Sequence, residues 1–145
     1  MYNKRAKLMK VEEANKMNVQ EMLDFMIDKI VGQGKRCVND GECSYGDGAG
    51  NHCAVGWVLN EEIEVFMDYD GDVMGLLDET VALRMQGDMP IAVIEHPRLF
   101  CAMQSLHDST RLSDRARFLE ALKRHHPQYN YDNPNWMKWV EMGEA

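Results

Sequence analysis

The sequence contains no long apolar run. A membrane-spanning helix needs about 18 or more consecutive apolar residues, and no run in this chain approaches that length. The start, MYNKRAKLMK, is basic but is not followed by an apolar stretch of the signal-peptide type. We therefore expect a protein that is not exported, makes no membrane contact and works in the cytoplasm.

Basic residues are scarce beyond the first ten positions. The chain carries 16 Lys and Arg against 24 Asp and Glu, which gives a net charge of −8. Four of the basic residues lie within positions 4–10, so the remaining 135 residues hold 12 basic and 24 acidic side chains, a net charge of −12. Because such an acidic body repels the phosphate backbone, nucleic-acid binding is disfavoured except through the basic N-terminal arm. A basic protein partner stays open, although the charge by itself also keeps a domain soluble.

No two cysteines form a close pair. Cys37, Cys43 and Cys53 are separated by gaps of five and nine residues, whereas structural zinc sites use pairs about two to four residues apart. His52 would project from a helix in a different direction from Cys53. Without a secretion signal, these thiols and Cys101 are expected to stay reduced. We therefore predict no metal, no cofactor and no disulfide.

An acidic stretch, DYDGDVMGLLDE, matches a calcium-binding loop in part. Asp68, Asp70, Asp72 and Glu79 fall at positions 1, 3, 5 and 12 of such a loop. The sixth position of the loop needs a glycine with positive φ, and here it is the β-branched Val73. We therefore interpret the stretch as an acidic surface turn.

The sequence also lacks an internal repeat, a linker and a low-complexity tract. Its 145 residues, 45% hydrophobic and 28% charged, have the size and composition of one globular domain spanning residues 1–145. We expect a mostly α fold, with α+β as the alternative, of about four to six helices and a small Gly/Cys-rich hairpin or loop. Apolar spacing predicts helices over 19–31, 73–86, 97–107 and 114–125. Asn18 and Glu21 resemble a capping box before the first of them.

Three segments stay open. Residues 1–17 form either a basic arm or a short helix. The stretch IAVI at 91–94 is too short to assign and is treated as a lone strand. The tail, 128–145, is aromatic, and its last turn presents Trp136 and Trp139 on one side.

The glycine-rich loop GDGAGN precedes a residue, Asn51, that we interpret as the N-cap of a helix beginning at His52. Free backbone N–H groups in such a loop, together with the helix dipole, bind anions. Asp47 opposes an anion, and the loop has neither a Walker lysine nor a strand-led GxGxxG pattern. We nevertheless predict a phosphate-bearing small molecule here, held in one pocket. The predicted ligand-binding residues are Tyr45, Gly48, Gly50, Asn51, His52 and Trp57.

A catalytic alternative uses Cys53 as a nucleophile. In the first turn of the expected helix, its thiolate would be stabilised by the helix dipole. His107, followed by Asp108, is the candidate general base. Packing explains the same residues, because His107 shares a helix face with Met103. We favour a binding protein over an enzyme and keep Cys53, His107 and Asp108 as the catalytic set of the alternative.

The Cys/Gly segment follows a longer pattern: G-K-x-S, then C-x-Y-R-G, then G-x-x-C-A-x-G-x-L-I-P-D-E, and later a helix that ends in I-H-D. The corresponding residues are Gly34, Lys35, Cys43, Tyr45, Gly50, Cys53, Ala54, Gly56, Asn60, Glu61, His107 and Asp108. On these residues, over roughly positions 24–124, the chain resembles an uncharacterised family of small tailed-bacteriophage proteins. It departs from the family at Gly46, which replaces an arginine, and at Asn60 and Glu61, which replace Pro-Asp.

The resemblance implies a virus-encoded accessory protein that works in the cytoplasm of an infected bacterium, and it implies no established activity. By analogy with other small acidic phage proteins, we predict that it captures a host component for host interaction or anti-defence. A phosphate-bearing small molecule, such as a nucleotide signal, is the preferred target. The alternative is an inhibitor that binds a host protein surface, which requires an exposed apolar patch around Trp136 and Trp139. A homo-oligomer stays open.

Overall fold

The computed structural model describes residues 10–39 and 42–145. Residues 1–9, which hold most of the basic arm, therefore lie outside the described part of the chain. The described residues form a mostly α-helical arrangement, which confirms the predicted fold class. None of the helices in these two ranges has both the length and the apolar character needed to cross a membrane.

Nine α-helices, one 3-10 turn and a two-stranded hairpin occur in the described residues. The helices are α1 (Val11–Lys16), α2 (Val19–Gln33), α3 (Glu64–Met67), α4 (Val73–Glu79), α5 (Val81–Met85), α6 (Ile91–Glu95), α7 (Pro97–Asp108), α8 (Leu112–His125) and α9 (Asn135–Glu141). The 3-10 turn is η2 (Val55–Val58), and the antiparallel strands are β1 (Val38–Asn39) and β2 (Glu42–Cys43). The small hairpin in the Gly/Cys-rich region is thus confirmed.

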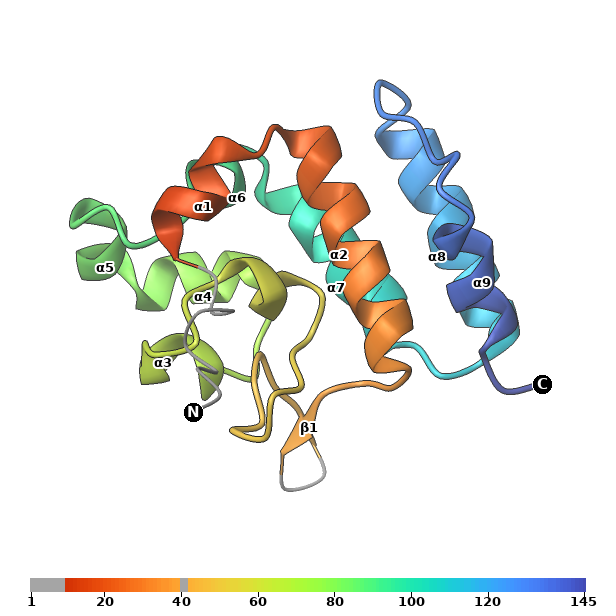
Figure 1. The fold of residues 1–145 in the computed structure, drawn as a ribbon, viewed down its shortest axis with the longest axis horizontal. Helices are drawn as coiled ribbons and strands as arrows, with labels where there is room; N and C mark the ends of the chain where they lie inside the picture. The colour runs from red at the N-terminus through yellow and green to blue at the C-terminus, as the bar shows by residue number, and fades with distance from the viewer. Residues whose placement is uncertain (1–9, 40–41) are drawn as a thin grey trace, which may run out of the picture.

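Helices α2 and α7 lie at the centre of the molecule (Figure 1). Helix α7 packs against α8 and α4, and α2 packs against α9 and η2. Helices α8 and α9 lie side by side at one end, and the short helices α1 and α3 to α6 lie at the other (Figure 1). The central helices α2 and α7 therefore contact both the pair α8 and α9 and the part built from short helices and loops.

Helix α2 forms where its local sequence predicts it. The side chain of Asn18 accepts from the backbone N–H of Glu21 at 2.8 Å, and the carboxylate of Glu21 accepts from the Asn18 N–H at 2.9 Å. This capping box supplies partners for two N–H groups at the helix start. Gly34 ends the helix in the left-handed conformation, with φ of 77°.

Two segments differ from the sequence prediction. The helix expected over 73–86 is broken at Thr80, which has φ of −120° and ψ of 33°. The Thr80 hydroxyl donates instead to the carbonyl of Leu76 at 2.6 Å, a local bond that competes with the helical ladder. The stretch 91–94 is not a strand but most of α6. These short helices explain why there are more helices than the four to six expected.

The two tail tryptophans belong to the core. Trp136 and Trp139 are 1% and 0% exposed, so these two side chains do not form the exposed patch that the alternative of a protein-binding inhibitor requires. The guanidinium carbon of Arg115 lies 3.8 Å from the centroid of the Trp139 ring. Arg115 also donates to the carbonyls of Ser109 and Trp139, each at 2.9 Å, and the Trp139 indole donates to Leu106 at 3.0 Å. One buried cation thereby joins α8 to α9 and to the link after α7.

We expect Arg115→Lys to lower the free energy of unfolding by about 2 kcal/mol, because lysine cannot stack on Trp139 and reach both carbonyls at once. Urea unfolding at neutral pH measures the change. The matched control is Arg117→Lys on the same helix, which alters an exposed side chain and should stay within about 0.5 kcal/mol of the wild type. Equal effects of the two substitutions would contradict the role given to Arg115.

Candidate functional site

Two side chains of α7 hold the start of the 3-10 turn. The Nδ1 atom of His107 accepts from the backbone N–H of Ala54 at 3.0 Å, and the side-chain oxygen of Gln104 accepts from the N–H of Val55 at 3.0 Å. All four residues are buried. Gln104 and His107, one helical turn apart, therefore cap η2 from a distant part of the chain.

Both ring nitrogens of His107 are occupied. Because Nδ1 accepts a hydrogen bond, the proton lies on Nε2, which donates to the carbonyl of Lys35 at 3.2 Å. The ring also packs against Trp139, with centroids 5.2 Å apart. Burial lowers the pKa of His107 to about 4, against the opposing effect of the bond to Lys35. His107 is thus a neutral structural residue rather than the predicted general base.

Cys53 is equally enclosed. Its thiol is fully buried, and the sulfur accepts from the N–H of Gly56 at 3.2 Å. Burial raises the pKa of the Cys53 thiol well above its usual value, although the Gly56 bond acts in the opposite direction. No helix begins at His52, which forms an isolated bridge with Gly46. The expected dipole effect on Cys53 is therefore missing, and the geometry does not support a nucleophile, even though His107 lies close by and Asp108 ends the same helix.

Gly56 is required by a close backbone contact. The N–H of Cys53 donates to the carbonyl of Tyr45 at 3.3 Å, and a Cβ on Gly56 would collide with that same carbonyl. The backbone at Tyr45 therefore passes too close to position 56 for any side chain. The Tyr45 hydroxyl donates to the carbonyl of Gly71 at 3.1 Å, so its ring is part of the core.

In the glycine-rich loop, the carboxylate of Asp47 occupies the position of a bound anion. Asp47 accepts from the backbone N–H groups of Ala49 and Asn51 at 2.8 and 3.1 Å, and from the Asn51 amide at 2.7 Å. Although burial opposes it, these bonds hold the pKa of Asp47 below its usual range. The φ values of Gly48 and Gly50, 75° and 95°, show that the glycines serve the turn. Two of the N–H groups expected to bind phosphate, those of Ala49 and Asn51, are already used by Asp47.

The structure does not bring the six predicted ligand-binding residues together. Gly48 and His52 line a cavity of about 340 Å³ that also contains three further carboxylates besides Asp47. Gly50, Asn51 and Trp57 line another cavity of about 410 Å³ beside Lys29. The expectation of one shared pocket is therefore wrong. Tyr45 lies in the core, and the remaining five residues are divided between two cavities.

His52 has a structural partner as well. Its Nε2 lies 2.8 Å from the carboxylate of Glu61, and the Gln33 side chain bonds both the N–H and the carbonyl of His52, at 2.8 and 2.9 Å. In the acidic stretch, Asp72 caps α4 by accepting from the Gly75 N–H at 2.8 Å. Within the described residues, no three His, Cys, Asp or Glu side chains are placed to hold a metal ion. The side chain of Cys43 lies outside the described part.

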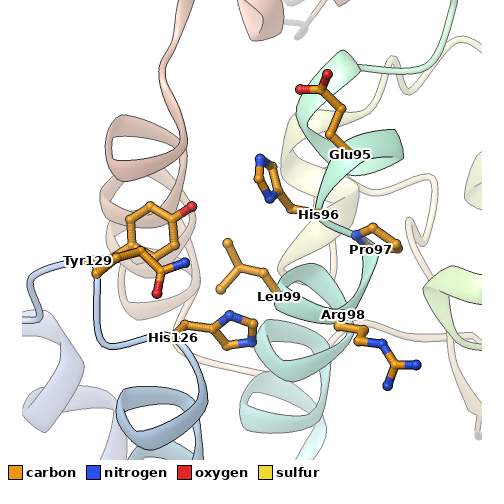
Figure 2. A pocket seen from close by; sticks show the side chains of 8 residues that line it. Glu95, His96, Pro97, Arg98, Leu99, His126 and Tyr129 are labelled. Carbon is orange, nitrogen blue, oxygen red and sulfur yellow. The ribbon is translucent and has the colours of Figure 1, made fainter.

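A different site lies where α7 begins and α8 ends. A cavity of about 320 Å³ opens between these two helix ends, and Figure 2 shows Tyr129 and His126 facing His96 across Leu99. The carboxylate of Glu95 points away from this gap (Figure 2). The lining residues are Glu95, His96, Pro97, Arg98, Leu99, His126, Gln128 and Tyr129.

A second cavity continues from the first along α7 and α8. It has a volume of about 430 Å³ and a mainly apolar wall, and it shares Arg98 and His126 with the first. Its remaining lining residues are Ala102, Ser105, Phe118, Ala121, Leu122 and His125. We call the two cavities together the α7/α8 groove, with Arg98 and His126 at its junction.

The groove gathers basic groups in an acidic protein. Arg98, His96, His125 and His126 line it, against the single acid Glu95. Within the described part of the chain, no side-chain hydrogen bond or ion pair engages Arg98 or His126. Burial lowers the pKa of His126, and the neighbouring His125 and His96 lower it further. A bound anion would offset both effects.

The residues of this groove were not predicted from the sequence. The stretches HPR at 96–98 and HHPQY at 125–129 mark a helix start and a helix end, and they are 27 residues apart at their nearest. Two short basic stretches at such ends were the available signal. Their meeting depends on how α7 docks on α8, which no local pattern specifies.

The chain matches none of the protein-family models, curated proteins or solved structures with which it was compared. The chemistry of the α7/α8 groove is therefore the basis for its proposed function.

We expect Cys53 and Cys37 to resist iodoacetamide in the native protein, because both thiols are buried, whereas the partly exposed Cys101 reacts first. Peptide mass spectrometry after timed labelling measures the three rates, and labelling in urea is the control in which all three react. Native labelling of Cys53 at the rate seen in urea would contradict its structural role.

We expect His107 to make folding sensitive to acid. Its pKa is about 4 in the folded protein against 6.5 unfolded, so the unfolded chain takes up the proton first as the pH falls. Stability should therefore fall between about pH 6.5 and about pH 4, by up to about 1.4 kcal/mol per pH unit. Urea unfolding across this range should give a flatter profile for His107→Gln and an unchanged one for the exposed control His125→Gln. Identical profiles for wild type and His107→Gln would contradict the assignment.

Proposed function

We propose that the protein binds a small phosphate-bearing molecule in the α7/α8 groove. The single observation that carries this proposal is the junction, where Arg98 and His126 line both cavities of one groove. The binding function is the one expected from the sequence, but the proposed place differs. In the loop at 46–53, Asp47 already accepts two backbone N–H groups and three further carboxylates line the same cavity, whereas the junction has donors without partners in the described residues.

The chemistry of the junction suits phosphate. A guanidinium presents a planar set of N–H donors that matches phosphate oxygens, and a protonated imidazole adds a second charged donor. The net charge of −8 repels anions over most of the surface. A cluster of basic groups on such a protein therefore localises an anion to the groove.

The mixed lining of the groove supports a small organic molecule rather than a bare ion. Ligand pockets combine apolar walls with a few placed polar groups and have volumes of about 300–1,000 Å³. The two cavities, about 320 and 430 Å³, lie in this range. The burial of Cys53 and His107 supports binding rather than catalysis. These are the nucleophile and the general base of the catalytic alternative, and neither side chain is accessible to a substrate. The viral setting rests on the resemblance of the Cys/Gly segment and stays a prediction.

We expect Arg98→Ala and His126→Ala each to weaken pyrophosphate binding at least about tenfold, the effect of losing one charge-assisted hydrogen bond. Isothermal titration calorimetry measures the affinity. The matched control, Arg124→Ala, removes a charge from the same end of α8 without touching the groove lining, and should change the affinity less than about threefold.

Binding should also strengthen from about pH 8 to about pH 6, because the anion favours protonated His126, and His126→Asn should reduce this dependence. Equal losses for all three alanine variants would indicate general charge attraction, and no binding by the wild type would refute the proposal.

A further inference from the structure

Each cavity of the α7/α8 groove contains one aromatic ring. Tyr129 lines the first cavity, and Phe118 lines the second. Both side chains are half-buried, so each ring has part of its surface covered by the protein and part uncovered. The two rings thus lie in different cavities that share one basic junction.

The walls near Phe118 leave space for a flat group. Ala102 and Ala121 line the same cavity, and both are small. The guanidinium carbon of Arg117 lies 5.4 Å from the centroid of the Phe118 ring. In the first cavity, Figure 2 shows Tyr129 across from His96 with Leu99 between them. An aromatic base stacks on such surfaces without a demand for a particular base.

We infer that the ligand of the groove is dinucleotide-like: two flat rings joined by a phosphate-containing link. The link lies at Arg98 and His126, one ring lies against Tyr129, and the other lies against Phe118. A mononucleotide would fill one cavity and leave the other to water. This inference rests on the proposed function and names its ligand class.

Three probes of similar charge isolate the contribution of the rings. Pyrophosphate has no ring, ADP has one, and the linear dinucleotide pApA has two, while each carries about three negative charges at neutral pH. Calorimetric titration of the full chain should give affinities in the order pApA, ADP, pyrophosphate, with about a tenfold step for each ring. Equal affinities of ADP and pApA would overturn the inference and leave the proposed function intact. Failure of all three probes to bind would overturn both.

Substitutions at the rings give an independent test. Tyr129→Leu and Phe118→Leu keep apolar volume but remove a flat surface, so each should reduce pApA affinity to about that of ADP without changing pyrophosphate affinity. The control Tyr69→Leu, an aromatic outside the groove, should leave all affinities unchanged. Unchanged pApA affinity in both groove variants would overturn the inference.

Phe118 also packs against the core, so Phe118→Leu could fail to fold. A substitution that fills the second cavity without changing Phe118 therefore provides a second test. Ser105 is exposed on α7 and lines the second cavity. Ser105→Trp should fill that cavity and lower pApA affinity to about that of ADP, with the ADP affinity itself retained through the first cavity. A Ser105→Trp protein that binds pApA as tightly as the wild type would overturn the inference.

Discussion

The capping of η2 by α7 is the interaction on which the rest of the structure depends. His107 accepts the N–H of Ala54, donates to Lys35 and packs on Trp139, so one buried ring joins α7 to the Cys/Gly segment, to the link after α2 and to α9. Gln104 satisfies the next N–H of the same turn. Because unpaired N–H groups are costly when buried, these two side chains decide how the loop half docks on the helical half.

Several polar groups near η2 and the glycine-rich loop have hydrogen-bond partners within the protein, whereas two side chains of the groove have none within the described residues. In the loop, Asp47 accepts the N–H groups of Ala49 and Asn51, and His52 pairs with Glu61. At the opposite end of α7, Arg98 and His126 have no such partners in the described residues and share one groove. Side-chain donors without a partner in the described residues therefore lie at the groove, at the end of α7 away from η2.

The sequence predicts those features whose causes are local. The capping box at Asn18 places α2, and apolar spacing places α7 and α8 within two residues at each end. It fails where distant residues decide. The break at Thr80 is a local exception, because the bond from its hydroxyl to the carbonyl of Leu76 leaves no trace in the apolar spacing. The turn after Cys53 depends on a distant residue, since it is capped by a histidine 53 residues away from Ala54. The groove was out of reach for the same reason, since it forms only when two helix ends meet.

We propose that phosphate binds at the α7/α8 junction and not at the glycine-rich loop. The most direct measurement is an NMR titration of the isotopically labelled protein with pyrophosphate, followed through backbone amide shifts. We expect the largest shifts at Arg98, Leu99 and His126. Shifts confined to Gly48, Gly50 and their neighbours, with the groove unchanged, would contradict it.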